Sequence, residues 1–353
     1  MENHHFQFSH ILFRSIQFKM RGKYDEYIHM MNKIALIYMG GTFGCIDQPL
    51  RPMPAAEFIT WLDRVIPPNN HVDCFAAEQI KDSSSCNAVD WLQLVMQIQR
   101  LSQDYQNFVI IHGTDTLSYA AATLARFLQD QVTVVITGSQ LPLLNREATA
   151  LDLHSDALPN LKTAISALST VEAGVYVAFD HSLFYAASCL KFHTTAQHAF
   201  LGQPYDANFE QHFVPAFALD PEHLELAQQL KIMSWMLQPG DPSLLTAQLQ
   251  HLSLAPPDFL ILQGFGTGNI AIDDALLSAL KQLRLQGCII ILTTQVTQGP
   301  LDQRYAISQW VLESEILVTD CQGHADLYAK ILKNYLQYRS PELCTAHWYD
   351  QSK

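Results

Sequence analysis

The stretch FVIIHGTDTLSYAAA, residues 108–122, constrains the fold of this chain more than any other part of the sequence. A short apolar run from Phe108 to Ile111 is followed by a histidine and a glycine, and apolar residues then recur at the spacing of a helix. A short apolar run of this kind is typical of a buried parallel strand. Thr114 and Asp115 therefore stand where a strand ends and a helix begins, which is the edge at which open α/β sheets bind ligands.

The same alternation of strand and helix patterns continues along the chain and begins again after residue 228. A length of 353 residues fits two domains at about 150 residues each. We expect an α/β fold with a larger N-terminal parallel-sheet α/β domain and a smaller C-terminal flavodoxin-like α/β domain. The expected segments are a disordered leader (1–30), the catalytic domain (31–199), a linker (200–228), the second domain (229–345) and a tail (346–353).

Composition excludes several classes of protein. The chain has 21 basic and 34 acidic residues and a net charge of −13, so it lacks the basic surface that nucleic-acid binding requires. No run approaches the roughly 18 apolar residues of a membrane span. Seven cysteines without a C-x-x-C pair fit free thiols in a reducing compartment. We expect a cytoplasmic protein.

Four other predicted loops carry polar residues beside glycine or serine. The first strand ends in Gly40-Gly41-Thr42-Phe43-Gly44, which alone would be a tight turn and lacks the G-K-[ST] of a phosphate loop. A later strand ends in Thr137-Gly138-Ser139-Gln140. The serines of Asp82-Ser83-Ser84 precede a helix, where serine is commonly a cap. The segment GFGTGN, residues 264–269, departs from the dinucleotide fingerprint.

These residues together indicate nucleophilic chemistry. A threonine hydroxyl is a poor nucleophile unless a base or a cation assists it. Thr114 has Asp115 beside it, and the fold could bring Lys191 to the same place, which would make a variant of the Ser-His-Asp arrangement. Backbone amides at the start of the following helix could hold a developing oxyanion. The G-x-S-x-G elbow is absent, so the residues alone predict only an acyl-transfer hydrolase.

The chain resembles the bacterial-type L-asparaginase/glutaminase family over about residues 31–340. The resemblance is carried by paired strand ends, IYMGGTFG (37–44) and HGTDTLSYAA (112–121). It continues through DSSSCNAVDW (82–91), ITGSQLPL (136–143), SDALPNLKTAI (155–165), CLKFHTTAQHAF (189–200) and GFGTGN (264–269). The family implies hydrolysis of L-asparagine through an acyl-enzyme, with no metal or cofactor, in a homodimer or homotetramer.

The resemblance also implies roles for individual residues. Thr42 would be the primary nucleophile, and Thr114, Asp115 and Lys191 would form a second set that polarises the amide or activates water. Ser83 and Ser84 match the residues that bind the substrate α-carboxylate, and Asp115 also matches the partner of the α-ammonium. The backbone of Ser139 would border the side-chain amide, Gly113 would be a further substrate-binding residue, and Asn269 would complete the site of a neighbouring subunit.

The chain departs from the family pattern in two places. The family usually carries a tyrosine near the first threonine, but residues 43–60 contain none. Tyr305 is the candidate substitute, weighed evenly against a purely structural tyrosine. The SDALPN run and the long segment 144–154 also differ, and we expect both differences to be peripheral.

Other functions remain open at this point. A related amidase could prefer glutamine, since one methylene gives only about 1–3 kcal/mol of discrimination. A glutamyl group on transfer RNA is disfavoured, because the acidic chain lacks an RNA-binding domain. A non-catalytic amino-acid-binding protein is the alternative from another class. In each case the expected partners are a small amino acid and further copies of this chain, with no nucleic acid and no membrane.

Overall fold

The computed structural model describes residues 33–67, 71–206, 217–297, 310–311 and 313–350. Its larger sheet has six strands, all parallel except for the last pair. Each of the first four strands of this sheet along the chain is five residues long. The three strands at the centre of the sheet are almost wholly buried. In chain order the strands are β1 (Ile34–Tyr38), β4 (Val72–Ala76), β5 (Asn107–Ile111), β6 (Thr133–Thr137), β7 (Gly174–Phe179) and β8 (Ser182–Tyr185).

The strand order of this sheet creates one switch point. The order is β4-β1-β5-β6-β7-β8, so the chain leaves β1 for β4 on one side and returns to β5 on the other. Neighbouring crossovers then run in opposite directions, which opens a crevice at the carboxyl ends of the two strands, as in flavodoxin-like sheets. The loops after β1 and β5 are those that carry Thr42 and Thr114.

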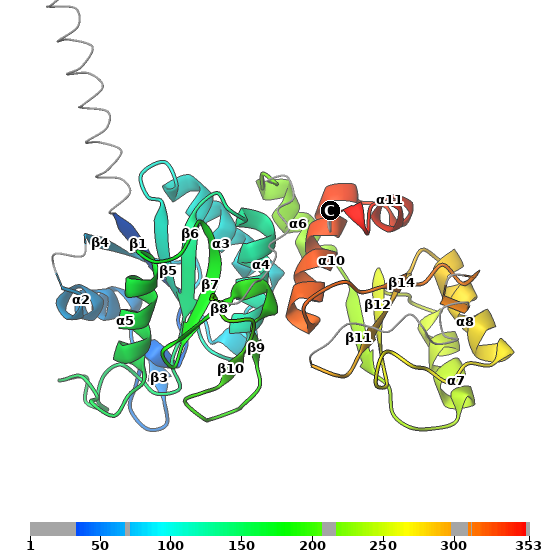
Figure 1. Cartoon of the computed structure of the whole chain (residues 1–353), viewed down its shortest axis with the longest axis horizontal. Coiled ribbons are helices and arrows are strands. Elements are labelled where there is room, and N and C mark those ends of the chain that lie inside the picture. The colour runs from blue at the N-terminus through cyan, green and yellow to red at the C-terminus, as the bar shows by residue number, and fades with distance from the viewer. Residues whose placement is uncertain (1–32, 68–70, 207–216, 298–309, 312, 351–353) are drawn as a thin grey trace, which may run out of the picture.

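Helices cover both faces of this sheet, as Figure 1 shows. Helices α3 (Ala88–Leu101) and α4 (Leu117–Leu128) pack on one face, and α2 (Ala55–Val65) and α5 (Ala157–Ala167) pack on the other. Side chains alternate between the two faces along each strand. In β5, Phe108 and Ile110 lie in the core on the α3–α4 side, while Val109 and Ile111 lie in the core on the α2–α5 side.

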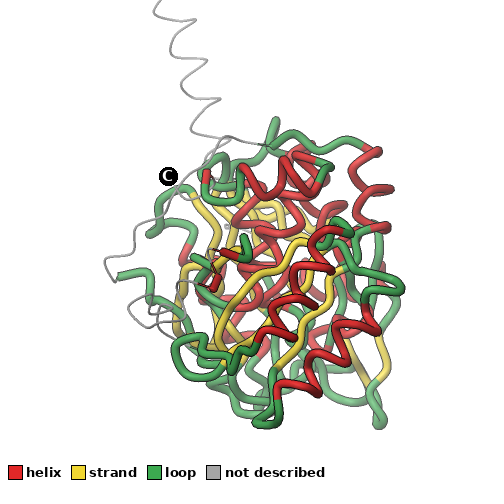
Figure 2. Tube along the Cα trace, turned by 90° about the vertical axis from the view of Figure 1, so that its right-hand side faces the viewer, coloured by secondary structure: helices red, strands yellow, loops and turns green. Residues whose placement is uncertain are grey.

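A second sheet forms the smaller domain. Its described strands are parallel and follow chain order, and in the side view of Figure 2 helices lie in front of strands. They are β11 (Ile232–Met236), β12 (Phe259–Gly264), β13 (Ile289–Thr294) and β14 (Leu317–Val318). Helices α7 (Pro242–Leu252) and α8 (Asp274–Leu285) pack on one face, and α10 (His324–Tyr338) and α11 (Pro341–Ala346) pack on the other. The expected fold class, a larger parallel-sheet α/β domain followed by a smaller α/β domain, is confirmed.

Helix α10 belongs to the cores of both domains and lies between the two sheets in Figure 1. Its Leu332 and Leu336 are buried in the core that contains α4, whereas Leu327 and Ile331 are buried against the smaller sheet. One helix therefore joins the two domains through apolar contacts on two of its faces.

Two segments differ from the expected organisation. The expected linker (200–228) contains β10 (Phe200–Leu201) and begins α6 (Pro221–Gln229). Pro221 stands in the first helical turn, where proline is compatible with a helix, and Asp220 caps that turn. The expected tail is not free either, because Trp348 is fully buried against the smaller sheet. The expected leader lies outside the described residues.

None of the helices in the described part of the chain has the length and apolar character needed to cross a membrane.

Candidate active site

Thr42 and Thr114 each come directly after a glycine, and the backbones of these two glycines touch each other. Gly41 has a φ of 85°, and a Cβ added to it would lie 2.3 Å from the Cα of Gly113. Only glycine allows the turn after β1 to approach the turn after β5 this closely. Thr42 and Thr114 are the residues that come next in each turn. The structure thus brings these two predicted residues to one place at the switch point.

Lys191 reaches the same place from another part of the chain. It lies in β9 (Leu190–Lys191), and its backbone N–H donates to Oγ of Ser118 in the first turn of α4 (3.0 Å). Its Nζ lies 2.9 Å from Oγ1 of Thr114 and 2.9 Å from Oδ1 of Asp115. Thr114 is buried and Lys191 is half-buried, whereas the Asp115 side chain is 59% exposed. The predicted hydroxyl, amine and carboxylate are therefore in contact.

This cluster has defined donors and acceptors. The Lys191 ammonium donates to Thr114 Oγ1, so the hydrogen of that hydroxyl is directed away from the lysine. Among the described residues, none donates a hydrogen bond to Oδ2 of Asp115, and none accepts one from the backbone N–H of Thr114. A carboxylate oxygen can bind an ammonium group, and a backbone amide can bind a developing oxyanion.

Ser83 and Ser84 lie in a 3₁₀ turn (Ser83–Ser85) before α3, and only Ser83 touches the cluster. The Oγ of Ser83 accepts the backbone N–H of Asp115 (3.2 Å), and its carbonyl accepts the hydroxyl of Thr116 (2.7 Å). Ser84 is exposed and donates to Asp82 through both its hydroxyl and its backbone N–H, which holds the pKa of Asp82 below its ordinary value.

Neither serine caps α3. Its N-cap is Asn87, which forms a reciprocal capping box with Asp90. The interpretation of these serines as helix caps is therefore wrong, and Ser83 serves instead to hold the turn that contains Thr114.

The turn after β6 is held by α5, which makes the SDALPN run more than peripheral. Asp156 accepts the backbone N–H groups of Gln140 (2.9 Å) and Leu141 (3.0 Å). Asn160 donates to the carbonyl of Gly138 (3.0 Å) and to Asp156 (3.1 Å). Asp156 and Asn160 are four residues apart on one helix face, so both reach the same turn. The expectation that this run is peripheral is wrong.

Ser139 lies within this turn and is buried. Its Oγ donates to the carbonyl of Leu141 (2.6 Å), so the side chain is used inside the turn. The spacing of Asp156 and Asn160 was the available signal for these positioning residues, which the sequence analysis did not assign. Ser118, which anchors Lys191, carried no comparable signal.

Of the remaining two predicted residues, only Asn269 is described, and it does not lie in this cluster. Asn269 is exposed on the turn after β12 and donates to Thr267 (3.2 Å). That turn belongs to the smaller sheet, and α10 separates the two sheets in Figure 1. Tyr305 lies outside the described residues.

The cysteine thiols and the possible metal ligands of the described residues add little to the chemistry of this cluster. All seven cysteines are free. Burial raises the pKa of Cys86 to about 11 and raises the pKa of Cys45, so both thiols are held in the weakly nucleophilic protonated form at neutral pH. In the described ranges no three histidine, cysteine or acidic side chains are grouped so that they could hold a metal ion.

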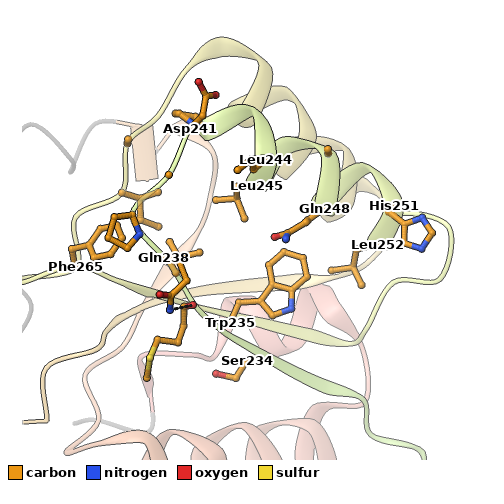
Figure 3. Close-up of a pocket in the computed structure, with 18 of the residues that line it drawn as sticks. Ser234, Trp235, Gln238, Asp241, Leu244, Leu245, Gln248, His251, Leu252 and Phe265 are labelled. Atoms are coloured by element: carbon orange, nitrogen blue, oxygen red, sulfur yellow. Dashed lines mark hydrogen bonds between the residues drawn. The ribbon is translucent and has the colours of Figure 1, made fainter.

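A cavity of about 940 Å³ lies in the smaller domain, between β11 and α7. Figure 3 shows Trp235, Leu244, Leu245 and Leu252 around it, with Gln248 among them. The lining includes none of the predicted site residues. The cavity is therefore separate from the candidate active site.

Comparisons with known proteins identify what this chain is similar to. A sequence profile described as "Asparaginase, N-terminal" matches residues 33–212. An L-asparaginase from Dirofilaria immitis is 27% identical over 257 residues, covering 68% of this chain and 41% of that protein. A 60 kDa lysophospholipase from Mus musculus is 30% identical, covering 64% of this chain and 40% of that protein. L-asparaginase 1 of Escherichia coli K12 is 25% identical, covering 73% and 75%.

The chain thus spans about two fifths of the length of the first two of these relatives. Among solved structures, the thermostable L-asparaginase from Thermococcus kodakarensis matches with a TM-score of 0.71 at 22% identity, covering 90% of this chain and 96% of the other. L-asparaginase I from Vibrio cholerae matches with a TM-score of 0.66 at 21% identity, covering 90% and 96%. These two structures share the fold.

Proposed function

The chain belongs to the asparaginase family, since the family profile matches residues 33–212 of its 353 residues, and we propose that it hydrolyses the side-chain amide of L-asparagine to L-aspartate and ammonia. The observation that carries this proposal is the position of Lys191 Nζ, 2.9 Å from both Thr114 Oγ1 and Asp115 Oδ1, at the turn that packs on Gly41. That arrangement provides two hydroxyls, a cation and a carboxylate at one strand edge.

The proposed reaction has two displacements. Oγ of Thr42 attacks the amide carbon, its proton passes to the departing nitrogen, and ammonia leaves an ester on Thr42. Water then attacks the ester and releases aspartate. Thr114, Lys191 and Asp115 polarise the amide or activate the water, and the backbone N–H of Thr114, which no described residue accepts, stabilises the oxyanion.

The same residues fit a zwitterionic substrate. One oxygen of Asp115 is held by Lys191, and the other can accept the substrate ammonium. The hydroxyl of Ser83 accepts the Asp115 N–H and can donate its own hydrogen to the α-carboxylate, and the hydroxyl of Ser84 can do so when it exchanges Asp82 for the substrate. Gly113 and the backbone at Ser139 border the amide. No metal or cofactor enters this scheme.

We further propose a cytoplasmic enzyme that works as a homodimer or homotetramer. Seven free thiols support a reducing compartment. The exposure of Asn269 on the smaller domain supports a role in the site of a neighbouring subunit.

Ammonia release from L-Asn, L-Gln and D-Asn tests the function. We expect L-Asn to be the best substrate, and Thr42→Ala and Thr114→Ala to lower kcat by at least about a thousandfold. Thr60→Ala is the matched control, because Thr60 is on α2 and its hydroxyl, among the residues that the structure describes, bonds only to the Ala56 carbonyl (3.0 Å). Full activity in both Thr42→Ala and Thr114→Ala would contradict the proposal. A glutaminase would prefer L-Gln, and a binding protein would release no ammonia.

A further inference from the structure

A buried histidine and tryptophan lie behind the turn that carries Thr114, on the side of α3. His112 is the residue directly after β5 and is fully buried, and Trp91 is 3% exposed on α3. The indole Nε1 of Trp91 lies 3.3 Å from Nε2 of His112, and Nδ1 of His112 lies 2.7 Å from the carbonyl oxygen of Gly113. Among the described residues, the imidazole of His112 thus connects Trp91 on α3 to the carbonyl of the Gly113–Thr114 peptide.

The two contacts determine the protonation of the imidazole. An indole N–H can only donate, so Nε2 must be the nitrogen that accepts and carries no hydrogen. Nδ1 then carries the hydrogen and donates it to the Gly113 carbonyl. Burial lowers the pKa of His112, which keeps the ring neutral, and the carboxylate that faces it, Asp90, is paired with Lys81 (2.6 Å).

The direction of the Gly113 carbonyl fixes the direction of the next amide. In a trans peptide the C=O and the following N–H point in opposite directions. A carbonyl held toward His112 therefore turns the N–H of Thr114 away from the buried ring, and no described residue accepts that N–H. Ser83 holds the same turn from its other side through Asp115 and Thr116.

Trp91 is itself held in place by aromatic neighbours. Its ring stacks on Tyr119 of α4 with centroids 6.2 Å apart, and Tyr328 of α10 packs edge-on at 5.9 Å. The donor is thus fixed by three helices, one of which belongs to both domains. A phenylalanine at position 91 could keep much of this ring packing while losing the N–H.

We propose that Trp91 and His112 are paired positioning residues for the candidate active site. Trp91 holds His112 in the Nδ1–H tautomer, and His112 then aligns the Gly113–Thr114 peptide with the reacting amide. The inference rests on the proposed function and adds to it two residues that do not touch the substrate.

A double-mutant cycle on the full chain tests the pair. Trp91→Phe should lower kcat for L-Asn by roughly tenfold to a hundredfold with KM little changed. The reason is that a misplaced Thr114 N–H stabilises the oxyanion of the transition state less well but has little effect on substrate binding. His112→Asn keeps an N–H that can reach the Gly113 carbonyl but has no tautomers. In that background Trp91→Phe should cost no further activity. Trp61→Phe, on α2, is the matched control and should leave kcat unchanged.

Equal losses from Trp91→Phe in both backgrounds would overturn the proposal, since they would show a packing role only. If Trp91→Phe does not fold, His112→Leu and His112→Asn decide the matter. Leucine cannot donate to Gly113, so His112→Leu should be the slower of the two, and equal rates would contradict the proposal.

Histidine ¹⁵N spectra separate this inference from the proposed function. The wild-type His112 signal, assigned by its loss in His112→Asn, should report the Nδ1–H tautomer, and Trp91→Phe should change it. An unchanged tautomer in Trp91→Phe would refute the pair even if the wild type is an active asparaginase. A wild type that releases no ammonia from any amide would refute the proposed function, and the spectra would still decide the tautomer.

Discussion

Gly41 and Gly113 touch backbone to backbone, and this contact determines how close the two candidate threonines can come. A Cβ added to Gly41 would lie 2.3 Å from the Cα of Gly113, and one added to Gly113 would lie 2.6 Å from Oγ of Ser83. The segments that contain Gly41, Ser83 and Gly113 thus meet at one point, and neither glycine has room there for a side chain.

Gly41→Ala should therefore separate the turns after β1 and β5. The φ of 85° and ψ of −178° at Gly41 lie in a backbone region almost restricted to glycine, which costs an alanine about 1–3 kcal/mol, and the clash with Gly113 adds to that cost. We expect a lower free energy of unfolding, and we expect kcat for amide hydrolysis to fall by more than the fraction of folded protein does. Gly240→Ala is the control, since a Cβ there meets nothing nearer than 3.8 Å. Wild-type kcat in Gly41→Ala would show that the contact does not position the site.

Lys191→Met should abolish activity without unfolding the protein. The substitution removes the cation that lies 2.9 Å from Thr114 Oγ1 and from Asp115 Oδ1, while the backbone bond to Ser118 remains. Loss of such a preorganised donor costs at least about a hundredfold in kcat. Lys162→Met, at an exposed position on α5, is the control. Steady-state ammonia release together with thermal melting would separate lost chemistry from lost structure, and a Lys191→Met enzyme of normal kcat would exclude this lysine.

The sequence was sufficient to predict the strand ends that build the site, because each combines a short apolar run with glycine. The strand before Gly40 and the strand before Gly113 both occur as expected, as β1 and β5. Their adjacency was also within reach, since parallel strands in one sheet place their carboxyl ends at one edge. Lys191 could be named from the residues only as a lysine that the fold could bring to Thr114, and the resemblance to the family then implied its role.

Two of the supporting residues could not be predicted from local patterns. Trp91 and Ser118 act through hydrogen bonds to segments 21 and 73 residues away. Such contacts depend on how the helices are packed rather than on periodicity. The helix α6 was missed for a different reason, because Pro221 lies in the segment that we expected to be a linker (200–228), although proline is favourable in the first turn of a helix.

The buried ion pair between α4 and α10 should contribute strongly to stability. Arg126 binds Asp326 through two hydrogen bonds of 2.7 and 2.8 Å, and the Asp326 side chain is 2% exposed. Arg126→Met leaves that carboxylate buried and unpaired, which costs about 3–5 kcal/mol. Arg339→Ala, which breaks an exposed pair with Glu222, should cost at most about 1 kcal/mol. Denaturant unfolding measures both, and equal costs would show that burial of the first pair is unimportant.

Acid should destabilise the protein through His112 before the carboxylates titrate. Burial lowers the pKa of His112 in the folded state, so below about pH 6.5 the unfolded chain binds a proton that the folded chain does not. The stabilisation is complete above the unfolded pKa and is lost as the pH falls toward the folded pKa, with a slope of at most about 1.4 kcal/mol per pH unit. Unfolding free energies between pH 8 and pH 5 should show this slope, and His112→Asn should flatten it. His154→Gln, at an exposed position, should not, and a slope that is the same in wild type and His112→Asn would mean that other groups cause the loss.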